Sequence, residues 1–78
     1  MNSLTANKSC LAVDVSFSTE KMIVFFEDGR ELSIPLEWFP KLKNATKKEL
    51  EQWRFIGDGE GIHWKALDED ILVEKLLE

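Results

Sequence analysis

The 78-residue sequence lacks several features by which small proteins are often classified. Its one cysteine, Cys10, permits no internal disulfide, no cysteine-rich zinc site and no Cys-x-x-Cys redox pair. It has no tyrosine, and His63 is its single histidine. No apolar run approaches the length of a membrane span or of a signal-peptide core. We therefore expect a cytoplasmic protein without a membrane segment and without a bound cofactor.

The charge of the chain is acidic and unevenly placed. Fifteen Asp and Glu residues against ten Lys and Arg give a formal net charge of −5, which disfavours direct nucleic-acid binding because phosphates are contacted by basic side chains. Four lysines form a cluster without an intervening acid: Lys41, Lys43, Lys47 and Lys48. Acids gather later in the chain. This pattern fits either two solvated faces or an acidic region that docks onto a basic partner.

The first half of the chain predicts three β-strands. Residues 10–17 alternate between apolar and polar, residues 22–26 are apolar on both faces, and residues 30–34 return after a three-residue loop ending at Gly29. The predicted partners are Phe17 with Met22, Val15 with Val24, Val24 with Leu32, and Met22 with Ile34. One face then collects an apolar set: Val13, Val15, Phe17, Met22, Val24, Phe26, Leu32 and Ile34.

The opposite face of this predicted sheet carries Ile23 and Phe25 among polar neighbours. Either a later segment covers these two side chains, or they form an exposed apolar patch. The turn that follows the third strand presents Trp38 and Phe39, which we expect to form a lid over the sheet as part of the core.

The second half predicts two helices. Thr46 and Glu49 have the spacing of a capping box, which begins a helix that runs to about Trp53. Asp70 is expected to be the N-cap of a final helix over residues 71–77, and residues 62–64 are compatible with a short fourth strand. The whole predicts an α+β fold: a three-stranded antiparallel meander with this additional strand, packed with a short helix and a C-terminal helix. Residues 1–9 are expected to be a flexible segment, and residues 10–78 a single domain.

Glycines at every second position form the most distinctive string of the chain: Gly57, Gly59 and Gly61, followed by Ile62, His63 and Trp64. A phosphate-binding loop is disfavoured because Asp58 and Glu60 stand between the glycines. A tight turn with positive φ or a close backbone approach accounts better for the spacing. The alternative is a small-ligand site that uses Gly59, Gly61, His63 and Trp64.

The acidic triplet Asp68, Glu69 and Asp70 lies before the predicted last helix. Such carboxylates usually serve a helix dipole and cap, although a loose cation site there stays open as an alternative. His63 as a general base would need a nucleophile or a carboxylate within reach, and Cys10 as a nucleophile would need His63 close by. The residues supply no complete catalytic set, so we expect no enzyme and assign no catalytic or metal-binding residue.

The motifs together resemble those of a bacterial family, the "domain of unknown function 2442" family, over residues 12–77. They are Asp28-Gly29-Arg30, Pro35-Leu36-x-Trp38-Phe39-Pro40-x-Leu42, Ala45-Thr46, Trp53, and Gly57-x-Gly59-x-Gly61-Ile62-His63-Trp64-x-x-Leu67-Asp68-Glu69-Asp70-Ile71. The resemblance implies a small α+β fold and no established activity. Some relatives are encoded beside another small protein, and such pairs are suspected of being toxin–antitoxin modules. Phe25 stands where relatives are often polar, which strengthens the case for an adhesive outer sheet face.

The sequence favours a non-enzymatic interaction module that binds a small protein partner or forms a homodimer, and we expect it to be the antitoxin-like member of a two-gene pair. The expected contact surface joins Ile23 and Phe25 to the acidic triplet Asp68, Glu69 and Asp70, since an apolar patch beside charge is typical of interfaces. The alternative is a domain that binds a small ligand or a metal through residues 57–64 and the triplet.

Overall fold

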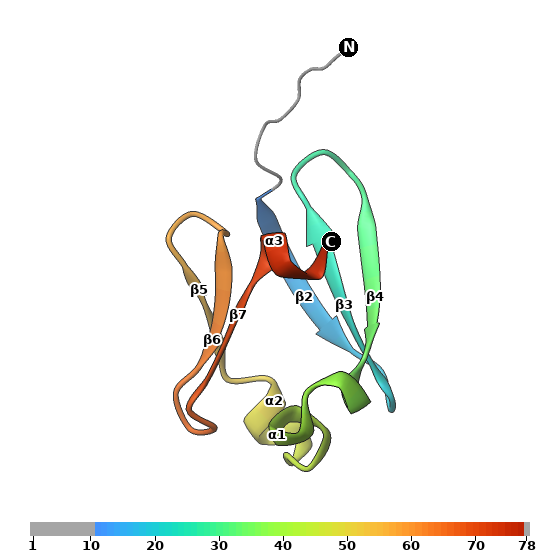
Figure 1. The fold of residues 1–78 in the computed structure, drawn as a ribbon, viewed down its shortest axis with the longest axis vertical. Helices are drawn as coiled ribbons and strands as arrows, with labels where there is room; N and C mark the ends of the chain where they lie inside the picture. Colours follow the sequence, from blue (N-terminus) through green and yellow to red (C-terminus); the bar gives the residue numbers. More distant parts are fainter. Residues whose placement is uncertain (1–10, 78) are drawn as a thin grey trace.

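The computed structural model describes residues 11–77, which form two three-stranded antiparallel sheets and several short helices (Figure 1). The first sheet has the order β2-β3-β4, with β2 at Ala12–Phe17, β3 at Lys21–Phe26 and β4 at Glu31–Pro35. A 3-10 helix η1 (Leu36–Trp38) and helices α1 (Pro40–Lys43) and α2 (Lys47–Leu50) follow. The second sheet has the order β5-β6-β7, with β5 at Trp53–Ile56, β6 at Gly61–Trp64 and β7 at Glu69–Leu72, and helix α3 spans Val73–Leu76. The architecture is α+β, as predicted.

The four strand partners predicted for the first sheet are all present. The predicted three-residue loop is confirmed as well, because Phe26 and Arg30 flank it and the Phe26 N–H donates to the Arg30 carbonyl at 2.9 Å. Gly29 has a φ of 94°, which explains why glycine stands at the end of this loop.

The prediction that Val13 faces the core is wrong. Ala12 pairs with Phe26 and Asp14 pairs with Phe25, so Val13 is the extra residue of a β-bulge. As a result, Ala12 is buried and Val13 is 54% exposed. The alternation of apolar and polar residues in the sequence cannot reveal such a bulge. The extra residue moves the residues before it to the opposite face of the sheet, although the sequence pattern continues unbroken.

The predicted capping box at α2 is confirmed. The Glu49 N–H donates to the Thr46 hydroxyl at 3.1 Å, and the Thr46 N–H donates to the Glu49 carboxylate at 2.9 Å. The expected extension of this helix to Trp53 is wrong, since the helix ends at Leu50 and Trp53 begins β5. The indole N–H of Trp64 donates to the Leu50 carbonyl at 3.0 Å and so satisfies one backbone group at the end of the helix.

The second sheet is larger than the single additional strand that the sequence predicts. β6 confirms that strand, and β5 and β7 pair on either side of it. The expectation that Asp70 caps the last helix is wrong: Asp70 lies within β7, and α3 begins at Val73 after Leu72, which makes no side-chain cap.

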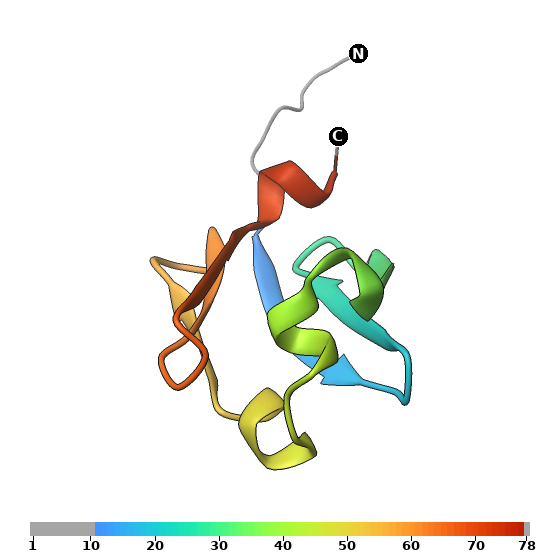
Figure 2. The same cartoon turned by 60° about the horizontal axis from the view of Figure 1, so that its bottom comes forward.

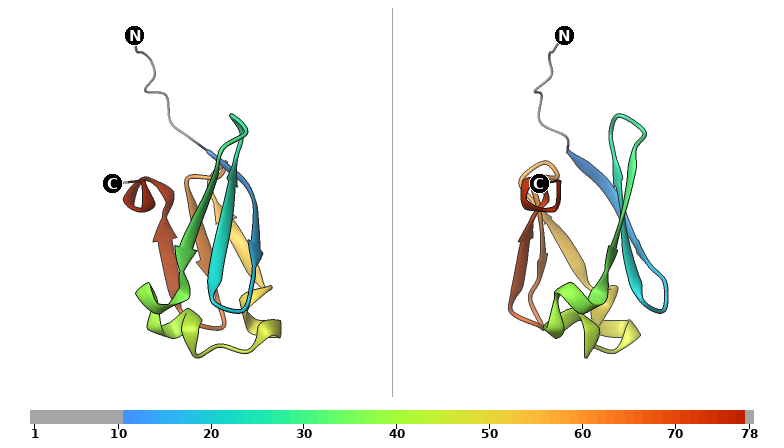
Figure 3. Two further views of the ribbon diagram at one scale, coloured as in Figure 1. Left: turned by 90° about the vertical axis from the view of Figure 1, so that its right-hand side faces the viewer. Right: turned by 45° about the vertical axis from the view of Figure 1, so that its right-hand side comes forward.

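The hydrophobic core lies between the two sheets (Figure 3). The first sheet contributes Val15, Met22, Val24, Phe26 and Ile34, and the second contributes Ile62, Trp64 and Ile71. The short helices close one end of the core with Leu36, Leu42 and Leu50, and Figure 2 turns this end toward the viewer. The rings of Phe17 and Trp64 meet edge to face at 6.4 Å across the two sheets.

The glycine string forms the turn between β5 and β6, and it joins the two sheets. Gly57 and Gly59 have φ values of 64° and 110°, as the expectation of a tight turn with positive φ requires. The Ala12 N–H donates to the Gly59 carbonyl at 2.9 Å, and a Cβ at Gly59 would lie 2.2 Å from the Ala12 carbonyl oxygen. Glycine is therefore needed here for a close backbone approach as well as for its φ.

No helix within residues 11–77 combines the length and the apolar character needed to cross a membrane.

Candidate functional site

Ile23 and Phe25 lie on the outer face of the first sheet, opposite to the core residues of β3. Both side chains are half-buried. Phe25 pairs with Asp14 on one side and with Glu31 on the other, so carboxylates flank its ring position. Within the described part of the chain, no helix or strand covers this face (Figures 1 and 3).

The acidic triplet lies on the second sheet, at the turn into β7. Asp68 adopts a φ of 53°, and its carbonyl accepts a hydrogen bond from Lys41 Nζ at 3.0 Å. The same ammonium lies 3.8 Å from the Glu69 carboxylate, and Asp70 pairs with Nδ1 of His63. The triplet is therefore held by α1 and β6, and the structure does not bring it together with Ile23 and Phe25.

The four residues considered as a ligand site do not converge. His63 and Trp64 are neighbours on β6 and point to opposite faces of the sheet, His63 outward and Trp64 fully into the core. Gly59 packs against the backbone of Ala12, and the side chains of Ile56 and Leu72 close over Gly61. Trp64 thus serves the core, because its ring is buried and its N–H bonded.

The outer face of the second sheet presents one polar row across its three strands. In the strand register Arg54 lies beside His63, and His63 lies beside Asp70. The Asp70 carboxylate orients the His63 ring through Nδ1. Among residues 11–77, no three or more His, Cys, Asp or Glu side chains are placed to hold a metal ion.

A cleft of about 430 Å³ lies between η1 and the edge strand β7, and we call it the Trp38 cleft. Trp38 and Phe39 form one wall, and the other wall consists of Asp70, Ile71, Leu72, Lys75 and Leu76. The expectation that Trp38 belongs to the core is wrong, since this residue is 64% exposed while Leu36 of the same turn is buried. Leu72 is also 44% exposed, so two of the exposed large apolar residues meet at this cleft.

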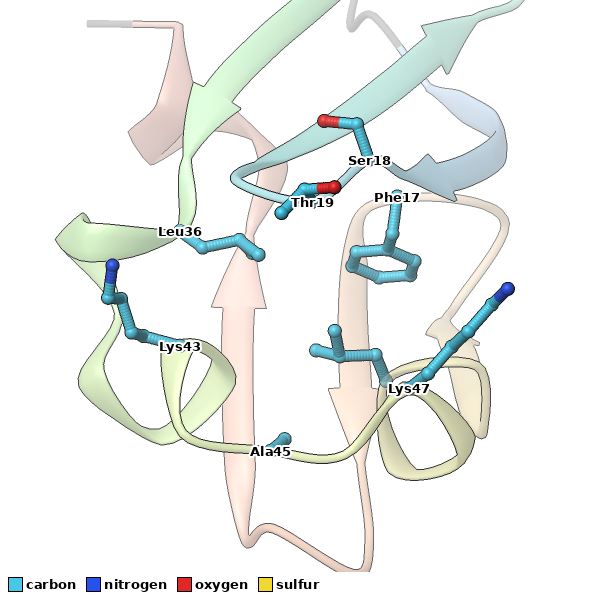
Figure 4. A pocket seen from close by; sticks show the side chains of 8 residues that line it. Phe17, Ser18, Thr19, Leu36, Lys43, Ala45 and Lys47 are labelled. Atoms are coloured by element: carbon cyan, nitrogen blue, oxygen red, sulfur yellow. The ribbon is translucent and has the colours of Figure 1, made fainter.

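A second concavity, of about 390 Å³, lies between the β2–β3 turn and the short helices, and we call it the lysine pocket (Figure 4). Its apolar side chains are Phe17, Leu36, Ala45 and Leu50. Its polar side chains are Ser18, Thr19, Lys43 and Lys47. Figure 4 shows the two lysines on opposite sides of the opening, with Phe17 and Leu36 between them. The sequence gives the lysines as a cluster but cannot show that an apolar hollow separates two of them.

Comparison with known proteins identifies the family of the chain. The model of the family described as "Protein of unknown function (DUF2442)" matches residues 12–78. The chain belongs to this family. The prediction of this family from the motifs is confirmed, and the description assigns no activity.

A similar fold is found in the crystal structure of another protein of unknown function. The crystal structure of a protein of unknown function from Rhodospirillum rubrum ATCC 11170 is similar to the chain with a TM-score of 0.78 and 25% sequence identity. The similarity covers 90% of this chain and 87% of that one. A search of proteins with curated descriptions finds no match for this DUF2442 chain.

Proposed function

We propose that this DUF2442 domain is a non-enzymatic interaction module of the bacterial cytoplasm, which binds a small basic protein as the antitoxin-like member of a two-gene pair. The observation that carries the proposal is the Trp38 cleft. Trp38, which is 64% exposed and lies beside an apolar hollow, is not one of the core residues, yet tryptophan is the kind of side chain that dominates binding energy at interfaces.

The position of the cleft favours an extended segment as the bound element. β7 is an edge strand of its sheet, and Asp70 and Leu72 of this strand line the cleft. A partner strand added to such an edge gains main-chain hydrogen bonds, and the adjacent pocket then selects a side chain. The four-residue length of β7 suits a short segment.

Charge decides which partner we propose. The chain carries a net charge of −5, and the side chain of Asp70, which is 65% exposed, lies in the cleft wall. Lys75 lines the same wall and balances the charge of Asp70 locally, so the net charge of the whole chain is what favours a basic partner. A segment with an apolar residue for the cleft and a basic residue for Asp70 is complementary to this surface. Of the acidic triplet, this proposal keeps Asp70 as a contact, and it replaces the outer face of the first sheet with the Trp38 cleft.

The first test is affinity purification of the tagged protein from its own host at native expression, with quantitative mass spectrometry. We expect one stoichiometric small basic protein, encoded beside this chain, whose toxicity on separate expression is relieved by co-expression. Recovery of the protein alone would overturn the proposal. A homodimer that Trp38→Ser dissociates would replace the basic partner with a second copy.

The second test locates the contact by titration calorimetry with the purified partner. Trp38→Ser is expected to weaken binding roughly 30-fold, the size of an interfacial hot spot. Phe25→Ser is the matched control, because it removes an aromatic ring from a different surface and should leave affinity unchanged. The converse result, with Phe25 sensitive and Trp38 insensitive, would move the contact to the first sheet. Thermal melts of both variants show whether folding is retained.

A further inference from the structure

We propose that the lysine pocket is a binding site for a small organic monoanion: a carboxylate attached to a compact apolar body such as a phenyl ring. The site shares no residue with the Trp38 cleft. It is therefore independent of the proposed protein partner, and either proposal can fail without the other.

The floor of the pocket is apolar and firmly held. Leu36 and Leu50 are core residues, and Phe17 packs edge to face on the buried Trp64. Three separate parts of the chain thus build the hollow: the β2–β3 hairpin, η1 and the α1–α2 segment. A volume of about 390 Å³ lies within the range that small-molecule sites occupy. The shape depends on the folded core, so the pocket should be present before any ligand arrives.

The rim carries positive charge in an otherwise acidic protein. Lys43 and Lys47 line the pocket, and none of its eight lining residues is acidic. Lys43 pairs with Glu37, whose carboxylate lies 3.5 Å from Lys43 Nζ. Both groups of that pair are largely exposed, so the pair is weak and leaves the lysine able to turn toward a ligand. Because Glu37 offsets part of the charge of Lys43, a ligand with a single negative charge matches the two lysines best.

Hydroxyl groups stand on the side of the pocket opposite Ala45 (Figure 4). The Ser18 hydroxyl accepts the Lys21 N–H at 3.2 Å and thereby fixes the β2–β3 turn. The Thr19 side chain lies at the same edge of the hollow, with its hydroxyl directed toward the Phe17 side. An apolar body seated on Phe17 and Leu50 would place its carboxylate at the mouth, where the ammonium groups of the two lysines and the Thr19 hydroxyl can donate to it.

The test titrates the ¹⁵N-labelled full chain with four probes that separate head group from body. These are 3-phenylpropionate, its neutral amide, 3-phenylpropylamine and acetate. Saturable shifts are expected for 3-phenylpropionate, with a dissociation constant on the order of 1 mM for a ligand of this size. The shifts should centre on Thr19, Ala45 and Lys47. The other three probes should bind at least about fivefold more weakly, since each lacks either the anion or the apolar body.

A pair of adjacent lysines supplies the matched control variants. Lys47→Gln removes a rim charge and is expected to weaken 3-phenylpropionate binding about fivefold. Lys48→Gln lies on the same helix outside the lining and should leave binding unchanged. The proposal would be overturned if the two variants weakened binding equally, or if 3-phenylpropionate and its amide bound equally well. It would also be overturned if 3-phenylpropionate bound without shifting the signals of Thr19 and Ala45. The same is true if no probe binds.

Discussion

Gly59 lies directly against the backbone of Ala12 in the other sheet, so a side chain there disturbs both sheets. We expect Gly59→Ala to destabilise the domain by more than about 3 kcal/mol, because φ strain adds to a collision with the Ala12 backbone. Urea unfolding followed by tryptophan fluorescence measures this loss. For a domain of this size, such a loss is a large fraction of the total stability.

Gly29 supplies the control for that substitution. It also has a positive φ, but a Cβ there would meet no atom within 4 Å. Gly29→Ala should therefore cost only the conformational strain, roughly 1–3 kcal/mol. If the two substitutions destabilise the protein equally, the close approach at Gly59 contributes nothing, and the sheets are held together elsewhere.

Among the elements, α2 is the one whose sequence signal and structure agree in detail. A helix of one turn is not stable by itself. The capping box and the Trp64 indole therefore supply hydrogen bonds that stabilise its two ends. We expect Thr46→Ala to destabilise the domain by about 1 kcal/mol, and Thr46→Ser, which keeps the hydroxyl, to cost much less. Thermal unfolding by circular dichroism measures both. A Ser variant as unstable as the Ala variant would contradict the role assigned to the hydroxyl.

The strands divide into those the sequence predicts and those it does not. β2, β3 and β4 are long enough for alternation, and Gly29 sets their register through the loop geometry. β5 and β7 have four residues each. β7 also contains Glu69 and Asp70, residue types that strands avoid and helix starts favour, so local propensity points to the wrong element. Pairing with β6 overrides that preference.

Sequence patterns also fail to show which candidate site residues lie together, because those residues are far apart in the chain. Composition and spacing single out Ile23, Phe25, His63 and the acidic triplet, and the structure describes all of them at or near the surface. Which of them share a surface depends on how two sheets pack, and no local pattern encodes that packing. The exposure of Trp38 could not be predicted either, because the aromatic residues of a small domain are normally expected in its core.

At the scale of the whole molecule, the two sheets share one core and should unfold as one unit. Trp53 and Trp64 both belong to the second sheet, and the chain has no tyrosine, so fluorescence mainly reports on that sheet. Circular dichroism reports on both. We expect the two urea transitions to coincide.

A Trp38→Phe variant removes the exposed indole and sharpens that comparison. Its fluorescence comes from Trp53 and Trp64 alone, and its transition should still match the dichroism curve. Separate midpoints would mean that one sheet can persist without the other, which the shared core makes unexpected.

The bulge at Val13 affects whether copies of the protein can associate through the edge of the first sheet. β2 is an edge strand, and a regular edge offers a row of unpaired N–H and C=O groups to any neighbouring chain. Here the extra residue interrupts that row, and the adjacent Val15 N–H is already taken by the Asp14 carboxylate at 2.8 Å. An irregularity that costs the sheet one pairing thus guards its open side against edge-to-edge aggregation in a crowded solution.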